Sequence, residues 1–427
     1  MPTDAYGLPV TTTSAEALAQ YDLGVAGLLG WHRDTIGFFG AAVEHDPGFA
    51  LAHAGLAVAL FVEERFAEAR AAAQRARALA PSASARERAH VEALARYVHV
   101  QMRDAEVAMR EHLAAHPRDL VVAQRQYFIW FFQGRFAEML ALTTALVREL
   151  LEDSYVLGLH AFSLEQLGHN AEALPFAERS IARNPEDTWG VHALAHILYE
   201  MGAWDDGLRR MPAVIEACVN MNYYRNHLLW HLVLMELSRG DYDRASRMTR
   251  EIFEREPSPL ALDLRNSISL LWRFEICGMG VKARWAPFVA VAQRFMNRPE
   301  DLMFHHAHLA MPLAAAGDWT SARAHLELLR ARVPGDPTGI LEPLVLPLIE
   351  GLHAFAEGDW RRVIAKIEPI RARIVEIGGS RAQRDVFHDT LLEACFRAGD
   401  GDRAQRLLAE RIARRPDHYW VTRKAVA

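Results

Sequence analysis

Apolar residues recur at every third or fourth position in segment after segment of this chain, which is the spacing of one face of an α-helix. The segment from Tyr155 to Leu167 has this pattern and stops at Gly168, a residue that can end a helix in a left-handed turn. The next segment, from Ala171 to Asn184, is rich in alanine and stops at Pro185, which cannot continue a helix. The pattern therefore predicts two helices joined by a short turn.

The same glycine stop recurs along the chain at intervals of 34 to 41 residues. An aromatic residue follows it two positions later in most cases, as in Gly317-Asp-Trp319. Self-similarity at this period is the sequence signature of a stacked helical array. We therefore predict an all-α solenoid of helical hairpins that can curl around a central pocket. The stop glycines are Gly134, Gly168, Gly202, Gly240, Gly278, Gly317, Gly358 and Gly399.

One domain over residues 1–427 is predicted, because a repeat array extends one continuous core. Residues 1–45 are less repeat-like and are predicted to form an N-terminal capping hairpin. Residues 400–427 are predicted to cap the other end, with the last helix at about Asp402 to Arg414.

The repeat unit resembles the tetratricopeptide repeat, with a small residue in its first helix, a glycine–aromatic turn and a closing proline. Other segments are more specific and are similar to the tetratricopeptide repeat protein 38 family. This resemblance spans nearly the whole chain and implies an all-helical, cytosolic protein, but it brings no settled activity. The segments are residues 21–59, 189–202, 227–240, 269–278 and 377–388.

Composition narrows the classes of partner. The net charge is −6 and the isoelectric point about 6.4, so no overall positive field attracts nucleic acid or an anionic membrane. We expect neither partner. The first residues lack the pattern of a signal peptide, and no stretch approaches eighteen consecutive apolar residues. Three scattered cysteines indicate reduced thiols, so a cytoplasmic location is expected.

Histidines carry the candidate chemistry. If each stop glycine is numbered 15 in its repeat, His192, His196 and Glu200 fall at positions 5, 9 and 13 of one helix. These positions lie one turn apart on a single helix face. In tetratricopeptide arrays that face generally lines the concave groove.

The following repeats place further imidazoles at nearby positions. His227, Trp230 and His231 fall at positions 2, 5 and 6, and His308 falls at position 6 two repeats later. We therefore predict that histidines from separate repeats share one inward-facing space. Asp263 and Arg273 are additional inward candidates.

The final repeat adds Arg384, Asp385 and His388 at the start of its first helix. They follow Gly378-Gly379-Ser380, a predicted tight turn whose free N–H groups could face an anion. If the array curls, this repeat approaches the middle ones.

Three functions are compatible with these residues. The first is a non-catalytic module that binds a polar or anionic small molecule, or a peptide segment, in a pocket lined by histidine, arginine and aspartate. The second is a hydrolase- or lyase-type enzyme. It would use His231, His192 or His388 as a general base, oriented by Asp385 or Glu200, and Arg384 for substrate charge. The third is a scaffold for another protein.

A resident metal or other cofactor is not expected, although a divalent ion held by histidines stays open as an alternative. Paired histidines one helical turn apart are a common zinc arrangement. The residue after His192 is Ala193 and not glutamate, which disfavours a zinc protease of the HExxH type.

Overall fold

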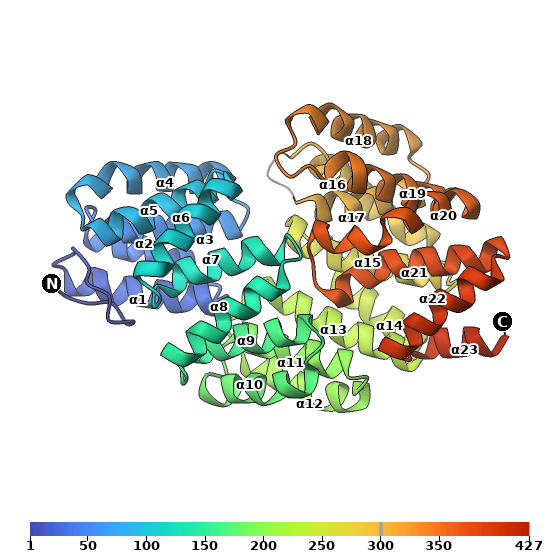
Figure 1. The fold of residues 1–427 in the computed structure, drawn as a ribbon, viewed down its shortest axis with the longest axis horizontal. Coiled ribbons are helices and arrows are strands. Elements are labelled where there is room, and N and C mark those ends of the chain that lie inside the picture. The colour runs from blue at the N-terminus through green and yellow to red at the C-terminus, as the bar shows by residue number, and fades with distance from the viewer. Residues whose placement is uncertain (299–301, 427) are drawn as a thin grey trace. The chain divides into compact units, whose positions relative to one another are not determined.

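The structure is a computed structural model that describes residues 1–298 and 302–426 (Figure 1). Throughout that part of the chain the regular elements are helices, accompanied by two isolated β-bridges and no strand. Ala427, the last residue of the predicted C-terminal cap, lies outside the described residues. The all-α prediction is confirmed.

Backbone contacts divide the chain into two compact units. The first comprises residues 1–131, 136–194 and 213–225, and the second comprises residues 132–135, 195–212 and those from 226 onward. The prediction of a single domain stays a prediction.

The first unit consists of consecutive antiparallel helices, each packed on the next (Figure 1). Helices α11 and α12 are each divided between this unit and the second. Its helices are α1 (Ala15–Gly30), α2 (Thr35–His45), α3 (Ala50–Val62), α4 (Phe66–Leu79), η1 (Ala80–Ser82), α5 (Ala85–Val98), α6 (Met102–Ala115), α7 (Leu120–Phe131), α8 (Phe136–Glu149), α9 (Ser154–Gln166), α10 (Asn170–Arg183), α11 (Thr188–Glu200) and α12 (Trp204–Ala217).

The second unit continues the hairpin pattern, and here α15 and α19 also pack against α21, so its late helices meet its early ones. Its further helices are α13 (Tyr224–Arg239), α14 (Tyr242–Thr249), η2 (Arg250–Glu254), α15 (Ala261–Ile276), η3 (Lys282–Trp285), α16 (Ala286–Phe295), α17 (Met303–Ala315), α18 (Trp319–Arg332), η4 (Val333–Gly335), η5 (Leu341–Val345), α19 (Leu346–Glu357), α20 (Trp360–Ile367), η6 (Glu368–Ile377), α21 (Arg381–Ala398), α22 (Gly401–Arg414) and α23 (His418–Val426).

The two helices of a hairpin differ in burial, as the repeat requires. Helix α9 is buried over almost its whole length, because neighbouring helices cover it on every side. Its partner α10 buries only a narrow stripe, formed by Ala173, Ala177 and Ser180. These small side chains allow the two helix backbones to approach closely.

The glycine stops behave as predicted. All eight have positive φ angles, between 69° at Gly134 and 92° at Gly240. Gly358 and Gly399 are the left-handed residues that directly end α19 and α21. The repeating unit is therefore a tetratricopeptide-like hairpin with a fixed turn.

Each end of the described chain consists of two helices that pack against each other. Helices α1 and α2 form the predicted N-terminal hairpin. At the other end α22 matches the predicted last helix, but α23 follows it after Pro416, so that prediction was incomplete. Asp417 caps the start of α23. Its carboxylate accepts a hydrogen bond from the Trp420 N–H in the first turn of that helix.

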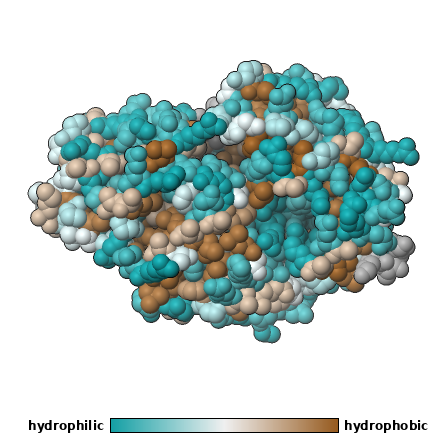
Figure 2. All heavy atoms as spheres, in the orientation of Figure 1, coloured by the Kyte–Doolittle hydropathy of each residue, from teal (hydrophilic) through white to brown (hydrophobic). Residues whose placement is uncertain are grey.

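The surface is mixed in character. Figure 2 shows hydrophilic and hydrophobic residues interspersed over the face it draws. Large exposed apolar side chains are scattered along the chain, among them Leu23, Val107 and Val219. Within the described part of the chain, no helix combines the length and the apolar character needed to cross a membrane.

Two glycines with similar φ angles offer a test of packing in the second unit. Gly378 has φ 86° and ψ −166°, a region open almost only to glycine, and a Cβ there would lie 2.7 Å from the backbone oxygen of Phe132. Gly317 has φ 81°, but a Cβ there would meet nothing within 4 Å.

We expect Gly378→Ala to lower the free energy of unfolding by about 3 kcal/mol or more, because strain and steric overlap add. Gly317→Ala should cost about 1–2 kcal/mol, from strain alone. Urea denaturation followed by circular dichroism measures both. Equal losses for the two variants would contradict the close approach of residues 132 and 378.

Candidate functional site

The residues singled out from sequence are almost all buried. His192, His196, Glu200, His227, Trp230, His231, Asp263, Arg273, His308, Arg384 and Asp385 each expose less than a tenth of their surface, and His388 is half-buried. They do not form one solvent-lined set, and their surroundings differ from residue to residue.

His192 belongs to an aromatic cluster in the first unit. Its ring stacks on Phe162, with centroids 5.1 Å apart, and lies edge-on to Tyr224 at 5.2 Å. Trp189 lies one turn earlier on α11 and packs against the same imidazole at 4.7 Å. In this setting His192 is part of the apolar core.

His196, His227 and His231 gather in the second unit. The ring centroid of His231 lies 4.3 Å from that of His196 on α11 and 4.9 Å from that of His227, one turn earlier on α13. Burial lowers the pKa of His227 to about 3 and holds that of His231 well below its usual range. His227 and His231 are therefore neutral at physiological pH.

A hydrogen-bonded chain orients His227. Its Nδ1 lies 2.9 Å from Oδ1 of Asn266 on α15, and the Asn266 amide nitrogen donates to Asp263 Oδ1 at 3.0 Å. Asp263 thus serves this cluster indirectly. Trp230 stacks on the same imidazole with centroids 5.0 Å apart, and its indole N–H donates to Ser269.

His308 lies elsewhere in the second unit. Its Nδ1 hydrogen-bonds to the Phe304 carbonyl oxygen at 2.8 Å, and its ring packs against Phe304 and Phe387. Burial lowers its pKa to about 3. The same helix register that unites His196 with His231 therefore does not bring His308 into their group.

Glu200 and Asp385 were predicted to orient an imidazole, but both carboxylates bind an arginine. Glu200 on α11 and Asp385 on α21 both accept hydrogen bonds from Arg415, at 2.7 and 2.6 Å. The Arg415 guanidinium is fully buried and lies 3.9 Å above the Tyr199 ring. Asp385 also pairs with Arg414, and these arginines hold the pKa of its carboxyl well below the usual range.

The predicted anion-binding turn is already satisfied internally. The Ser380 N–H donates to Gln383 and the Gly378 N–H to Val375, so two of the turn donors are used within the chain. Arg384 donates to the carbonyl of Gly379. This arrangement is a capping box that starts α21, and it contradicts the expectation of free donors there.

A hollow of about 420 Å³ lies in the second unit, one turn beyond the histidines along α11 and α13. Its walls come from α11, α13, α15, α21, α22 and α23. The lining residues are Tyr199, Leu234, Leu237, Ser238, Arg273, Ile276, Cys277, Asp389, Arg411, Asp417, Tyr419 and Trp420.

Arg273 is the charged group of this hollow that is not neutralised in place. Its guanidinium donates to the carbonyl oxygens of Ser269, at 3.1 Å, and Ala382, at 2.7 Å. It also lies 5.6 Å above the Trp230 ring. Among the residues that the structure describes, no carboxylate lies within ion-pair distance of it, and burial lowers its pKa.

The other charged side chains of the hollow form direct ion pairs with one another. Arg411 donates to Asp389 at 2.9 Å and to Asp417 at 2.5 Å. The sequence did not predict these site residues, because the helix at about Asp402 to Arg414 was expected to be the last one. The available signal was Asp417 followed by Tyr419 and Trp420, a helix-capping residue before an apolar pair.

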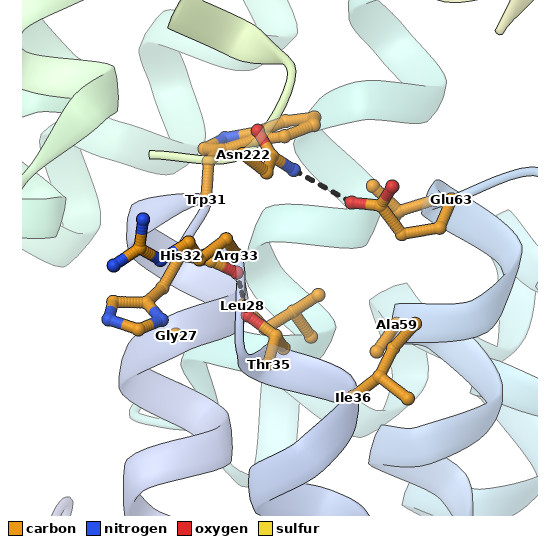
Figure 3. Close-up of a pocket in the computed structure, with 11 residues that line it drawn as sticks. Gly27, Leu28, Trp31, His32, Arg33, Thr35, Ile36, Ala59, Glu63 and Asn222 are labelled. Carbon is orange, nitrogen blue, oxygen red and sulfur yellow. Dashed lines mark hydrogen bonds between the residues drawn. The ribbon is translucent and has the colours of Figure 1, made fainter. Parts of the chain in front are cut away.

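A second hollow, of about 290 Å³, lies in the first unit between the end of α1 and the loop before α13 (Figure 3). Asn222 donates to Glu63 at 2.9 Å, and Arg33 is exposed at the rim. This hollow is smaller, and the Glu63 carboxylate at its wall is already hydrogen-bonded.

Comparison with known proteins identifies no family. No protein-family model matches the chain. A structure of the human IFIT1 dimer with PPP-AAAA contains a chain of 14% identity, with 93% of this chain and 89% of that chain covered and a TM-score of 0.44. A structure of Naa15/Naa10 bound to HypK-THB contains a chain of 12% identity. The match covers 92% of this chain and 62% of that chain, with a TM-score of 0.25. At these TM-scores neither similarity assigns a function.

Arg415 gives the first test of this region. Arg415→Met leaves Glu200 and Asp385 buried with fewer partners, so we expect a loss of about 3–5 kcal/mol in the free energy of unfolding. Arg362→Met is the control, because its ion pair with Glu357 is exposed and should contribute less than about 1 kcal/mol. Chemical denaturation measures both variants, and a loss below 1 kcal/mol for Arg415→Met would contradict the network.

Buried neutral histidines predict a dependence of stability on pH. Burial lowers the pKa of His308 and His325 to about 3 and that of His353 to about 4. The unfolded chain then binds more protons than the folded one below about pH 6.5. Each group should lower stability by about 1.4 kcal/mol per pH unit as pH falls from 6.5 toward 4. Thermal unfolding at pH 7.5 and 5.5 measures this, and equal midpoints would contradict it.

Proposed function

We propose that the protein is a non-catalytic binding module that takes up a small anionic molecule in the hollow of the second unit. The observation that carries the proposal is Arg273. It is a buried guanidinium on the wall of a 420 Å³ space, and its two hydrogen bonds go to neutral carbonyl oxygens. A bound carboxylate or phosphate would give Arg273 the direct ion pair that it lacks within the described part of the chain.

The energetic argument is one of desolvation. A buried charge is costly unless a countercharge and hydrogen bonds compensate it. Arg411 and Arg415 each form ion pairs with two carboxylates, whereas Arg273 forms none with the described residues. An anion that enters the hollow therefore gains an ion pair with a group that is already positioned and already desolvated.

The lining of the hollow supports a small ligand. Leu234, Leu237 and Ile276 offer apolar surface, while Tyr199 and Tyr419 place aromatic rings at the wall. These features favour a compact molecule with one anionic group and an apolar body.

Catalysis by the histidines is less well supported. A general base works best when its pKa lies near the working pH. Burial lowers the pKa of His388 to about 4 and that of His227 to about 3. The carboxylate of Asp385, which would orient a base, is instead held by two arginines.

The resemblance to the tetratricopeptide repeat protein 38 family belongs to this proposal, as does a cytoplasmic location. Both rest on sequence segments and composition. A cytoplasmic protein of that kind would meet metabolites that carry carboxylate or phosphate groups.

Isothermal titration with acetate, succinate, glutamate and inorganic phosphate, together with mass spectrometry of molecules that copurify, tests the proposal. We expect an anionic compound to bind and Arg273→Met to weaken it about 10- to 100-fold, since a hydrogen-bonded charge contributes about 1.5–3 kcal/mol. Arg33→Met, at the rim of the other hollow, is the control and should bind like the wild type.

The proposal fails if nothing anionic copurifies and no compound of the series binds below millimolar concentration. It also fails if Arg273→Met folds and binds as well as the wild type. A peptide that binds through its terminal carboxylate with the same Arg273 dependence would extend the ligand class to peptides.

A further inference from the structure

We propose that His196, His227 and His231 form a binding site for one divalent transition-metal ion, such as Zn²⁺ or Co²⁺. The site lies within the second unit and is distinct from the hollow proposed to bind an anion. Imidazole nitrogens are common ligands of these ions, and three of them leave a fourth coordination position open.

The positions of the ligand atoms support this site. One nitrogen from each of the three rings lies within 4.8 Å of the others. A tetrahedral ion with metal–nitrogen bonds of about 2.0–2.1 Å requires the nitrogens to be somewhat closer, which small ring rotations achieve. His227 and His231 lie one turn apart on α13, and His196 faces them from α11.

The surroundings of His227 match those of a metal ligand. The Asn266 amide nitrogen donates to the Asp263 carboxylate, so its oxygen is the group that faces Nδ1 of His227 at 2.9 Å. His227 must then carry its proton on Nδ1, so Nε2 is its unprotonated ring nitrogen. Metal-binding histidines are usually held in this way by a partner on the other ring nitrogen.

The cluster lies close to the wall of the hollow. Tyr199, on that wall, has its ring centroid 6.4 Å from that of His231. The hollow and the three histidines are therefore neighbours within the second unit.

A second histidine cluster, in the first unit, lacks these properties and provides a contrast. His90 and His112 lie 2.7 and 2.9 Å from the same oxygen of Asp119. The Arg86 guanidinium lies 3.3 Å from that oxygen, so a cation is already present. The close positive charge disfavours a metal ion there.

Titration of chelator-treated protein with Co²⁺ tests the proposal through the visible absorption of the bound ion. Cobalt is added both to the folded protein and during refolding from urea, so that slow entry into a buried site cannot hide binding. We expect about one equivalent per chain, and displacement of Co²⁺ by Zn²⁺.

Variants then locate the site. His231→Asn and His196→Asn should each lower affinity for Co²⁺ at least 100-fold. His308→Asn is the matched control, because it replaces an equally buried histidine of the same unit outside the cluster. Asn266→Ala should weaken binding about 10- to 100-fold while the absorption bands of the bound ion persist.

X-ray absorption spectroscopy of the zinc-loaded wild type keeps the test independent of how the variants fold. Three imidazole nitrogens in the first shell are expected. The proposal is overturned if the wild type takes up no Co²⁺ by either route, if the bound ion has fewer than three imidazole ligands, or if His231→Asn folds and retains full affinity.

Discussion

The second unit depends on one fully buried guanidinium, that of Arg415. It donates to Glu200 near the start of the unit and to Asp385 near its end, positions separated by 185 residues (385 minus 200). Both carboxylates and the guanidinium are removed from water, so the pair contacts must form together or not at all. This network draws the last helices against α11 and so creates the hollow.

The hollow and the histidine cluster both result from that closure and lie next to each other. They favour ligands of opposite charge. Arg273 brings to the hollow a guanidinium that has no direct ion pair within the described part of the chain, which favours an anion. His196, His227 and His231 bring ring nitrogens together at a neighbouring position, which favours a cation. An ion held by the histidines would also lie close to the hollow, so occupation of the two sites should be coupled.

The local features of the fold could be predicted from sequence, because they depend on residues close together in the chain. Gly168 and Gly358 stop helices by their own backbone freedom, and Ala173 and Ala177 mark the contact stripe of α10. The register that placed His196 and His231 on inward faces likewise follows from helix geometry. That His196 and His231 actually meet depends on how α11 packs against α13, which the register alone does not determine.

The remainder of the site depends on long-range closure, which no repeat period encodes. Asp385 was predicted to orient an imidazole, but its carboxylate pairs with Arg415 once the unit closes. His192 shares a helix face with His196, yet its neighbours Trp189 and Phe162 make it part of an aromatic core. Arg411 donates to Asp417, which lies just before α23. The sequence did not predict α23, so it did not predict this pair as part of the site.

The most direct test is a crystal structure of the protein as purified, in which the electron density around the Arg273 guanidinium is examined. The account predicts electron density for an anionic group within hydrogen-bond distance of that guanidinium, inside the hollow bounded by Tyr199 and Tyr419. A structure in which a carboxylate of the chain itself, such as Asp389, pairs with Arg273 and fills the hollow would contradict it.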